Sequence, residues 1–198
     1  MRWNRISRFA AALTLGVAVG TPSYAEPAVA SAASVVTEVE SAYKDVASLR
    51  ADFVQTTRSA SMGGEVKEKG RIFLEKPRKM RIEFSGQSDK LFLADGENLW
   101  IYTPADKQAI RMAEVSSGGS VGFDLQDLSS LDQHFTVELL DDPANKRAYV
   151  LELKPKAASQ YQKVRLVFSR KRMVLERLVL FDAFGSETEM RFTNLKLN

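Results

Sequence analysis

One short stretch of the sequence carries the pattern of a catalytic nucleophile. Residues 118–122 match G-x-S-x-G, the turn that presents the serine of many hydrolases. That turn needs a strand before the serine and a helix after it, with an acid and then a histidine later in the chain. Ser116 and Ser117 come directly before it and indicate a loop instead of a strand.

The partners that such a serine needs are crowded together. Asp124, Asp127 and Asp132 lie between Ser120 and His134, the only histidine of the chain. The order of the residues is that of a hydrolase, but the segment is too short to bring them from separate elements. We therefore predict a flexible loop here, and we do not expect an enzyme.

Other polar clusters do not indicate catalysis or a cofactor. With no Cys and a single His, a metal site is not expected, and no phosphate-binding loop for a nucleotide is present. Asp141 and Asp142 precede Pro143, a pattern typical of a turn. The basic run from Arg170 to Arg172 lies between two predicted strands. It indicates a solvated hairpin tip or, alternatively, a contact with anionic headgroups or an acidic partner.

The first 25 residues have the pattern of a secretory signal peptide. Three arginines precede the apolar stretch Phe9 to Val19, and Ser23 and Ala25 supply the small residues of a cleavage site. The apolar stretch is shorter than the roughly 20 residues that cross a bilayer. We therefore expect residues 1–25 to be removed on export and residues 26–198 to form a single domain.

Removal of the signal changes the charge of the protein. The whole chain has 28 basic and 25 acidic residues, and the signal holds three arginines and no acid, which leaves 25 of each. A formally neutral protein lacks the basic surplus of a nucleic-acid binder. No nucleic-acid partner is therefore expected.

The exported part is predicted to begin with one helix. From Ser34, a good N-cap, apolar side chains recur at steps of three and four residues as far as Phe53. Beyond Val66 the pattern changes to that of strands separated by turn residues. The predicted strands are residues 66–75, 79–85, 90–94, 99–103, 108–114, 135–140, 147–153, 162–169, 173–182 and 187–197.

Only residues 115–134 interrupt the series of strands. There Phe123, Leu128 and Leu131 could face one side of a short second helix. So many consecutive strands form an antiparallel sheet that must curl. The fold class is therefore predicted as α+β, mainly β: an incomplete antiparallel β-barrel, in the form of a curled meander, with a helical lid over its concave face.

The hairpin from Leu91 to Pro104 raises a separate question. Half-buried strands alternate apolar and polar residues, but LFLA and LWIY do not. Both faces of this hairpin therefore need cover from water.

Two preceding strands place a set of apolar side chains on one face. These residues share a parity, and flexible methionines such as Met80 and Met112 suit a surface that accepts variable shapes. The set is Ile72, Leu74, Met80, Ile82 and Phe84. A dry core and a ligand cavity have the same pattern, so periodicity alone leaves both interpretations open.

Three segments occur in a recognisable order: LRADFVQTT at 49–57, GRIFLEKPRKMRIEF at 70–84 and LFLADGENLWIYTP at 91–104. Together they resemble the outer-membrane lipoprotein carrier family of periplasmic chaperones. The resemblance implies a half-barrel with a helical lid, enclosing a hydrophobic cavity for the acyl chains of lipoproteins. The lining residues that it implies are Ile72, Leu74, Met80, Ile82, Phe84, Leu99, Trp100 and Met112.

The resemblance also implies a place and partners. The protein would be a monomeric, cofactor-free periplasmic carrier, loaded by an inner-membrane ABC-type lipoprotein-releasing complex and unloaded to an outer-membrane acceptor. A lipid-sensing regulatory half-barrel of the periplasm is the alternative.

One position departs from the family pattern. Many members have Arg before the proline of the second segment, where it holds the lid shut, and this chain has Lys76. Lysine keeps the charge but lacks the planar fork of donors. Lys76 is therefore expected to act as a weaker or differently made lid latch.

Overall fold

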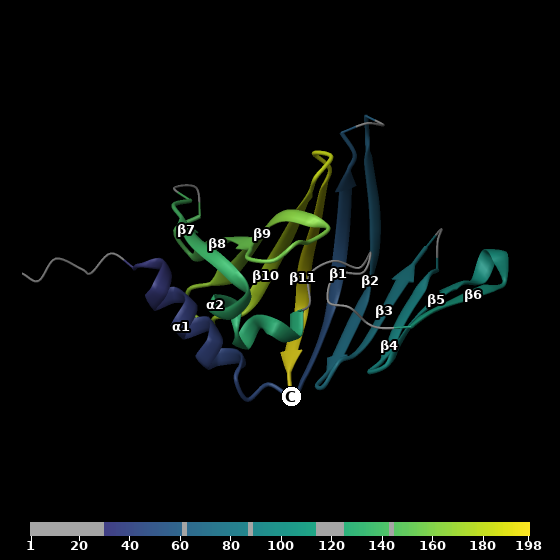
Figure 1. Cartoon of the computed structure of the whole chain (residues 1–198), viewed down its shortest axis with the longest axis horizontal. Helices are drawn as coiled ribbons and strands as arrows, with labels where there is room; N and C mark the ends of the chain where they lie inside the picture. Colours follow the sequence, from purple (N-terminus) through teal and green to yellow (C-terminus); the bar gives the residue numbers. More distant parts are fainter. Residues whose placement is uncertain (1–29, 61–62, 87–88, 114–124, 143–144) are drawn as a thin grey trace, which may run out of the picture.

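A helix leads into a long series of strands in the computed structural model, which describes residues 30–60, 63–86, 89–113, 125–142 and 145–198 (Figure 1). Helix α1 spans Ala32–Tyr43, and two short helical segments, η2 (Leu125–Ser129) and α2 (Leu131–His134), precede β7. A further turn, η1, spans Pro104–Asp106. The strands are β1 (Ser48–Arg58), β2 (Glu65–Glu75), β3 (Lys79–Ser85), β4 (Leu91–Asp95), β5 (Asn98–Thr103), β6 (Gln108–Ala113), β7 (Phe135–Leu140), β8 (Ala148–Pro155), β9 (Tyr161–Ser169), β10 (Leu175–Asp182) and β11 (Glu187–Leu197).

These strands form one antiparallel sheet in the order β6-β5-β4-β3-β2-β1-β11-β10-β9-β8-β7. Strands β6 and β7 lie at opposite edges, so the curled sheet does not close into a barrel. The predicted incomplete antiparallel barrel is confirmed. The single meander is corrected: β1 pairs with both β2 and β11, and so joins two meanders, β2–β6 and β7–β11.

The segment that begins at Ser48 was predicted to continue the helix, and that prediction is wrong. Leu49, Ala51 and Phe53 are buried while Arg50 between them is exposed, which is the alternation of a strand. Leu49 and Phe53 are four residues apart, a spacing that fits a helical stripe and one face of a strand equally well. The β-branched residues that follow Phe53 favour the strand.

Helix α1 begins one turn earlier than predicted. Its N-cap is Ser31: the Ser34 N–H donates to Ser31 Oγ at 3.1 Å, and the Ser31 N–H donates to Ser34 Oγ at 3.0 Å. This reciprocal pair satisfies two backbone donors at the helix start. Both serines are good caps, so residue type alone did not distinguish them.

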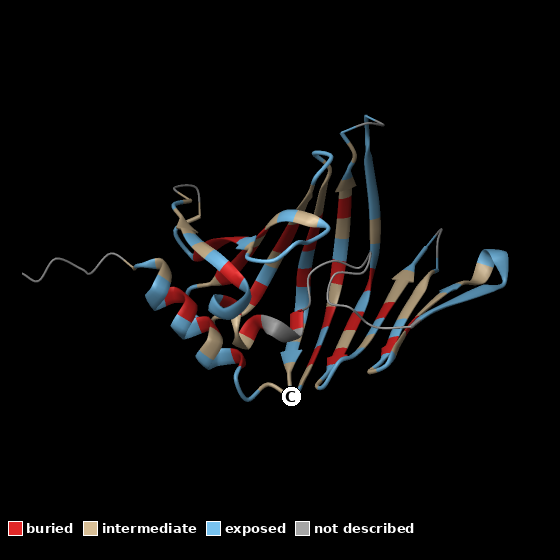
Figure 2. Ribbon diagram, in the orientation of Figure 1, coloured by how far each residue is buried: buried red, intermediate tan, exposed pale blue. Residues whose placement is uncertain are grey.

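The helices pack on one face of the sheet, which we call the inner face (Figure 1). Val35 and Val39 of α1, with Leu128 and Leu131 of the two short helical segments, are fully buried there. The predicted second helix is thus two short pieces, and Phe123 lies outside the described residues. Buried positions gather on the strands beneath the helices (Figure 2), so this cover makes the core.

Tyr43, the last residue of α1, ties the helix to the C-terminal half of the sheet. Its hydroxyl accepts a hydrogen bond from the Leu175 N–H at 3.0 Å, and its ring meets Phe168 edge-on at 6.1 Å between centroids. The side chain is buried, and burial raises the pKa of Tyr43 above its ordinary value. The hydroxyl therefore stays neutral. Its hydrogen bond with Leu175 holds the C-terminal end of α1 against the sheet.

Substitution of Tyr43 tests this anchor. Tyr43→Phe leaves the ring in place but removes the acceptor of a buried N–H, so the free energy of unfolding should fall by about 1–3 kcal/mol. The measurement is urea unfolding followed by circular dichroism. Tyr102→Phe, at a tyrosine that is 40% exposed, is the control and should change stability by less than about 0.5 kcal/mol. If the two variants lose the same free energy of unfolding, the hydroxyl of Tyr43 does not anchor α1.

The turn of the β4–β5 hairpin depends on Asp95. Its carboxylate accepts hydrogen bonds from the Asn98 N–H at 2.7 Å, the Glu97 N–H at 2.9 Å and Trp100 Nε1 at 3.1 Å. These donors, the Asn98 N–H first among them, hold the pKa of Asp95 well below its ordinary range. The ionised carboxylate therefore stabilises the hairpin.

A pH dependence follows from Asp95. Because its folded pKa is depressed, its contribution is complete above the ordinary carboxyl pKa of about 3.9 and is lost as the pH falls through the folded pKa. Asp95→Asn should therefore be less stable than the parent at neutral pH, with the difference narrowing progressively below about pH 4. Urea midpoints across this range give the test, with Asp106→Asn as control. If the difference in stability between the parent and Asp95→Asn does not change with pH, the charge of the carboxylate does not stabilise the hairpin.

Candidate functional site

The inner face is not covered along its whole length. Beyond the helices it forms a hollow of about 280 Å³. An apolar floor from β3, β4, β10 and β11 consists of Ile82, Phe84, Phe92, Leu180 and Met190. A polar rim consists of Gln55, Thr57, Glu68, Lys90 and Thr188. An apolar floor with polar groups at its margin is the usual make-up of a site for an amphiphilic ligand.

Aromatic rings form one wall of this hollow. Phe84 meets Phe53 at 5.3 Å and Phe92 at 5.8 Å between centroids, in edge-to-face contacts. Gly70 makes the Phe53 position possible, because a Cβ there would lie 2.8 Å from Phe53 Cζ and 2.0 Å from the Glu83 carbonyl oxygen. The residue type at 70 thus lets the ring lie across β2.

The residues predicted from the sequence as the cavity lining fall into three groups. Ile82 and Phe84 line the hollow, and Ile82 is also part of the core, with 2% of its surface exposed. Ile72, Leu74 and Leu99 are buried, and Met80 packs at the margin of the core. Met112, which pairs with Leu99 on the edge strand, is 43% exposed. The set therefore spans core, hollow and edge of the same face.

Trp100 is the exception, and its placement in the lining is corrected. It pairs with Leu93, whereas its neighbour Leu99 pairs with the inner-face residue Ala94. Trp100 therefore lies on the other face of the sheet, here called the outer face. In a strand that is apolar on both faces, the residue types do not reveal which face is which.

Sequence reasoning missed three floor residues. Phe92 pairs with Ile82 across β3 and β4, so the predicted lining on β3 together with hairpin register could have found it. Leu180 and Met190 come from β10 and β11, and β11 reaches this part of the face only because it pairs with β1. No local pattern signals that pairing.

Lys76 lies where the helix meets the sheet. Its Nζ donates to the carbonyl oxygen of Tyr43 at 3.3 Å. The two residues also line a small cavity of about 20 Å³ beneath the segment that joins α1 to β1. Tyr43 therefore contacts the N-terminal half of the sheet through its carbonyl and the C-terminal half through its hydroxyl.

The other sequence candidates are placed as follows. Residues 118–122 and Asp124 lie outside the described residues. His134 ends α2 and meets Phe135 edge-on. The Asp142 carbonyl accepts from the Asn145 N–H at 3.0 Å, as expected for a turn. Arg170, Lys171 and Arg172 form an exposed turn between β9 and β10.

Within the described ranges, no three His, Cys, Asp or Glu side chains are grouped so that they could hold a metal ion. No helix among these residues is long and apolar enough to cross a membrane.

The structure defines a class of fold: a curled, open antiparallel sheet with helices over part of its apolar inner face. Consistent with this class, a family model described as outer membrane lipoprotein carrier protein LolA matches residues 44–198. The chain belongs to the outer-membrane lipoprotein carrier family.

Curated relatives extend over most of the chain. The outer-membrane lipoprotein carrier protein of Dechloromonas aromatica is 32% identical over 168 residues, 84% of this chain and 79% of the relative. That of Cupriavidus necator is 30% identical over 203 residues, 98% of this chain and 89% of the relative.

Solved structures share the fold at low identity. A DUF1329 family protein from Desulfovibrio piger superposes with a TM-score of 0.52 at 14% identity, covering 83% of this chain and 90% of that one. An uncharacterized conserved protein from Thermus thermophilus gives a TM-score of 0.50 at 14% identity, covering 84% and 87%. These similarities concern the fold alone.

The contact of Lys76 with α1 generates a prediction about the lid. Lys76→Met keeps most of the stem but removes the charged donor, so α1 should separate from the sheet more often. A charged hydrogen bond contributes roughly 1.5–3 kcal/mol when buried and less at this half-exposed position. We therefore expect amide hydrogen exchange in α1 to accelerate about three- to tenfold.

The matched control for this measurement is Lys79→Met. Lys79 lies in the same β2–β3 hairpin and pairs with Glu75 at 3.0 Å on an exposed surface, where such pairs contribute little. Exchange in α1 should be unchanged in the control. If both variants exchange like the parent, Lys76 has no part in holding the lid.

Proposed function

We propose that this protein is a non-enzymatic carrier that shields the acyl chains of lipoproteins and transfers them from the inner to the outer membrane. The observation that carries the proposal is the partly covered inner face, where an apolar floor continues from the core into an open hollow. Family membership supports the same cargo. The floor, with Ile82 and Phe84, is the part of the inner face to which we assign the acyl chains.

The energetics of acyl chains require such a shield. Burying a chain of about fifteen methylenes is worth roughly 12 kcal/mol, at about 0.8 kcal/mol for each. A lipoprotein with several chains does not cross water at a useful rate without a cover. Release must also be possible, and a face that is only partly covered retains less of this energy than a sealed cavity.

The size of the hollow indicates how cargo is accommodated. Its volume of about 280 Å³ lies just below the roughly 300–1,000 Å³ typical of small-molecule pockets. Several acyl chains need more room, which α1 and the short helical segments can provide only by moving off the inner face. The contacts of Tyr43 with Leu175 and Lys76 are the ones that must break first. In this proposal Lys76 is the latch, and Ile72, Leu74, Met80 and Leu99 become lining when the lid lifts.

Location and partners complete the proposal. Residues 1–25 direct export, residues 26–198 act as one domain in the periplasm, and an inner-membrane ABC-type complex supplies the energy for loading. Unloading to an outer-membrane acceptor is downhill and needs no nucleotide. Carrier and sensor differ at this last step, because a lipid-sensing regulator would retain its ligand.

Filling the hollow should block cargo without harming the fold. Thr57 and Thr188 pair across β1 and β11 on the rim, so Thr57→Phe places a ring in the hollow and leaves the core untouched. We expect at least about a tenfold loss of acyl-lipid binding, with little change in thermal stability. Native mass spectrometry with a triacylated lipoprotein gives the bound fraction.

The control for Thr57→Phe is Thr136→Phe, at an exposed position of β7. This variant should bind like the parent. If Thr57→Phe binds normally, acyl chains do not enter the hollow and the site assignment is wrong, whatever the family.

Transfer itself needs a two-step assay with purified components. Cargo should load from inner-membrane vesicles only with an energised transporter, and should then leave to acceptor membranes without added ATP. Cargo that stays bound in the presence of every acceptor would contradict the carrier and favour the sensor.

A further inference from the structure

The outer face of the sheet carries one continuous row of basic and apolar side chains. Strand register places one member of the row on each of seven neighbouring strands, from β11 to β6. We call this row the basic stripe, and it consists of Lys196, Arg50, Phe73, Arg81, Leu93, Trp100 and Arg111. It contains no acidic residue.

Two of its cations stand side by side. Arg50 and Lys196 are direct partners in the register of β1 and β11, and like charges in that position destabilise a sheet. Among the described residues, neither side chain forms an ion pair with a carboxylate. Within the molecule this repulsion is left uncompensated, and a bound anionic group would relieve it.

The apolar members of the stripe on β4 and β5 form the second apolar face of the β4–β5 hairpin, which the sequence predicted to need cover from water. Leu93 is 37% exposed, and Phe73 and Trp100 are half-buried. Leu91 and Tyr102 extend this apolar surface along β4 and β5. Arg111 stacks on Trp100, with its Cζ 5.6 Å from the ring centroid. Arginine with exposed aromatic residues is the composition of protein interfaces.

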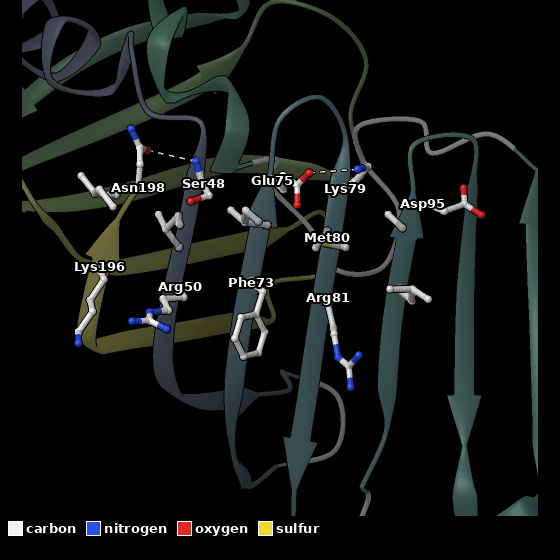
Figure 3. Close-up of a pocket in the computed structure, with 15 residues that line it drawn as sticks. Ser48, Arg50, Phe73, Glu75, Lys79, Met80, Arg81, Asp95, Lys196 and Asn198 are labelled. Atoms are coloured by element: carbon white, nitrogen blue, oxygen red, sulfur yellow. Dashed lines mark hydrogen bonds and ion pairs between the residues drawn. The ribbon is translucent and has the colours of Figure 1, made fainter.

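The stripe is also recessed. A groove of about 780 Å³ includes Lys196, Arg50, Phe73, Arg81 and Leu93 in its lining. Figure 3 shows the first four side by side, with the Phe73 ring between the two arginines. The neighbouring row adds Lys79 and the carboxylates of Glu75 and Asp95, so that basic side chains outnumber acidic ones in the groove. A groove accepts a protruding chain better than a flat surface.

We propose that the basic stripe binds an extended acidic and apolar segment of a partner protein, lying across the strands. Its carboxylates would meet Arg50 and Lys196, and its apolar side chains would lie on Phe73 and Leu93. Arg81 already donates to Glu83 at 2.7 Å and adds positive charge beside them. This site is separate from the inner-face hollow, because successive side chains of a strand point to opposite faces. Loading of cargo and docking of the partner therefore use different surfaces.

The charges on either side favour a chain over a membrane. Glu75 and Asp95 lie in the row on one side of the stripe with Lys79 between them, and Asp52 and Glu83 lie in the row on the other with Arg71 between them. Each flanking row therefore carries two acidic residues and one basic residue. An anionic bilayer would have to approach all three rows, whereas a single extended chain meets the stripe and the row with Glu75 and Asp95 that lines the same groove. Seven strands at about 4.8 Å span roughly 29 Å, the length of about nine extended residues.

Trp100 provides the signal for a test. The only other tryptophan is Trp3, which lies in the proposed signal peptide, so the measurement uses the protein that begins at residue 26. The titrant is a synthetic peptide of about nine residues, without Trp, in which Glu alternates with Leu. Binding should shift the emission of Trp100 to the blue in a saturable manner, and added salt should weaken it. A peptide with Lys in place of Glu is the first control and should not bind.

Charge reversal then separates binding from folding. Arg50→Glu should weaken peptide binding about tenfold or more, while it creates an attractive pair with Lys196 and leaves thermal stability equal or higher. The matched control is Lys69→Glu, on the outer face of β2 away from the stripe, which should bind within about twofold of the parent. Equal losses in the two variants would overturn the proposal.

Two further outcomes would also overturn it. The second titrant is vesicles of phosphatidylglycerol. A Trp100 response to these vesicles, with none to the peptide, would make the stripe a membrane contact. No response to either would mean that the stripe is not a docking surface. Neither result bears on the inner-face hollow, so the proposed carrier function is tested independently.

Discussion

An open, curled sheet with an apolar inner face has to be covered, and this constraint governs the rest of the molecule. The cover is made by one helix and two short helical segments, which are too small for the whole face. Where the cover ends, the core continues as an open apolar hollow. The fold and the proposed site are therefore parts of one surface, divided by the extent of the helices.

The contacts at the end of α1 decide how much of the inner face the helices cover. Tyr43 meets one half of the sheet through Leu175 and the other through Lys76, with one hydrogen bond on each side. The four buried side chains of α1 contribute roughly 6–12 kcal/mol, so that with two hydrogen bonds the attachment is of the same order as the burial of one acyl chain. Such a cover suits a protein that must both accept apolar cargo and give it up.

The two faces of the sheet have different chemistry on the same strands. On β3, Ile82 faces the hollow while Arg81 lies in the basic stripe on the outer face. On β5, Leu99 is buried while Trp100 beside it lies on the outer face. A strand carries both because successive side chains point in opposite directions. The proposed cargo site and the proposed partner site therefore lie on opposite faces of the sheet.

The sequence by itself determined the kind of sheet, the presence of a leading helix and the two-sided apolar hairpin, because these depend on local period and turn chemistry. It also contained the segments that indicate the family, and the parity of Ile82 and Phe84. The tertiary structure alone decided that Leu49 to Phe53 form a strand, because a spacing of four residues fits both periods. Only the tertiary structure placed Trp100 on the outer face and brought Met190 beside Phe92. Whether an apolar position becomes core or cavity depends on how far the helices reach, and that distance is not encoded in the period of any strand.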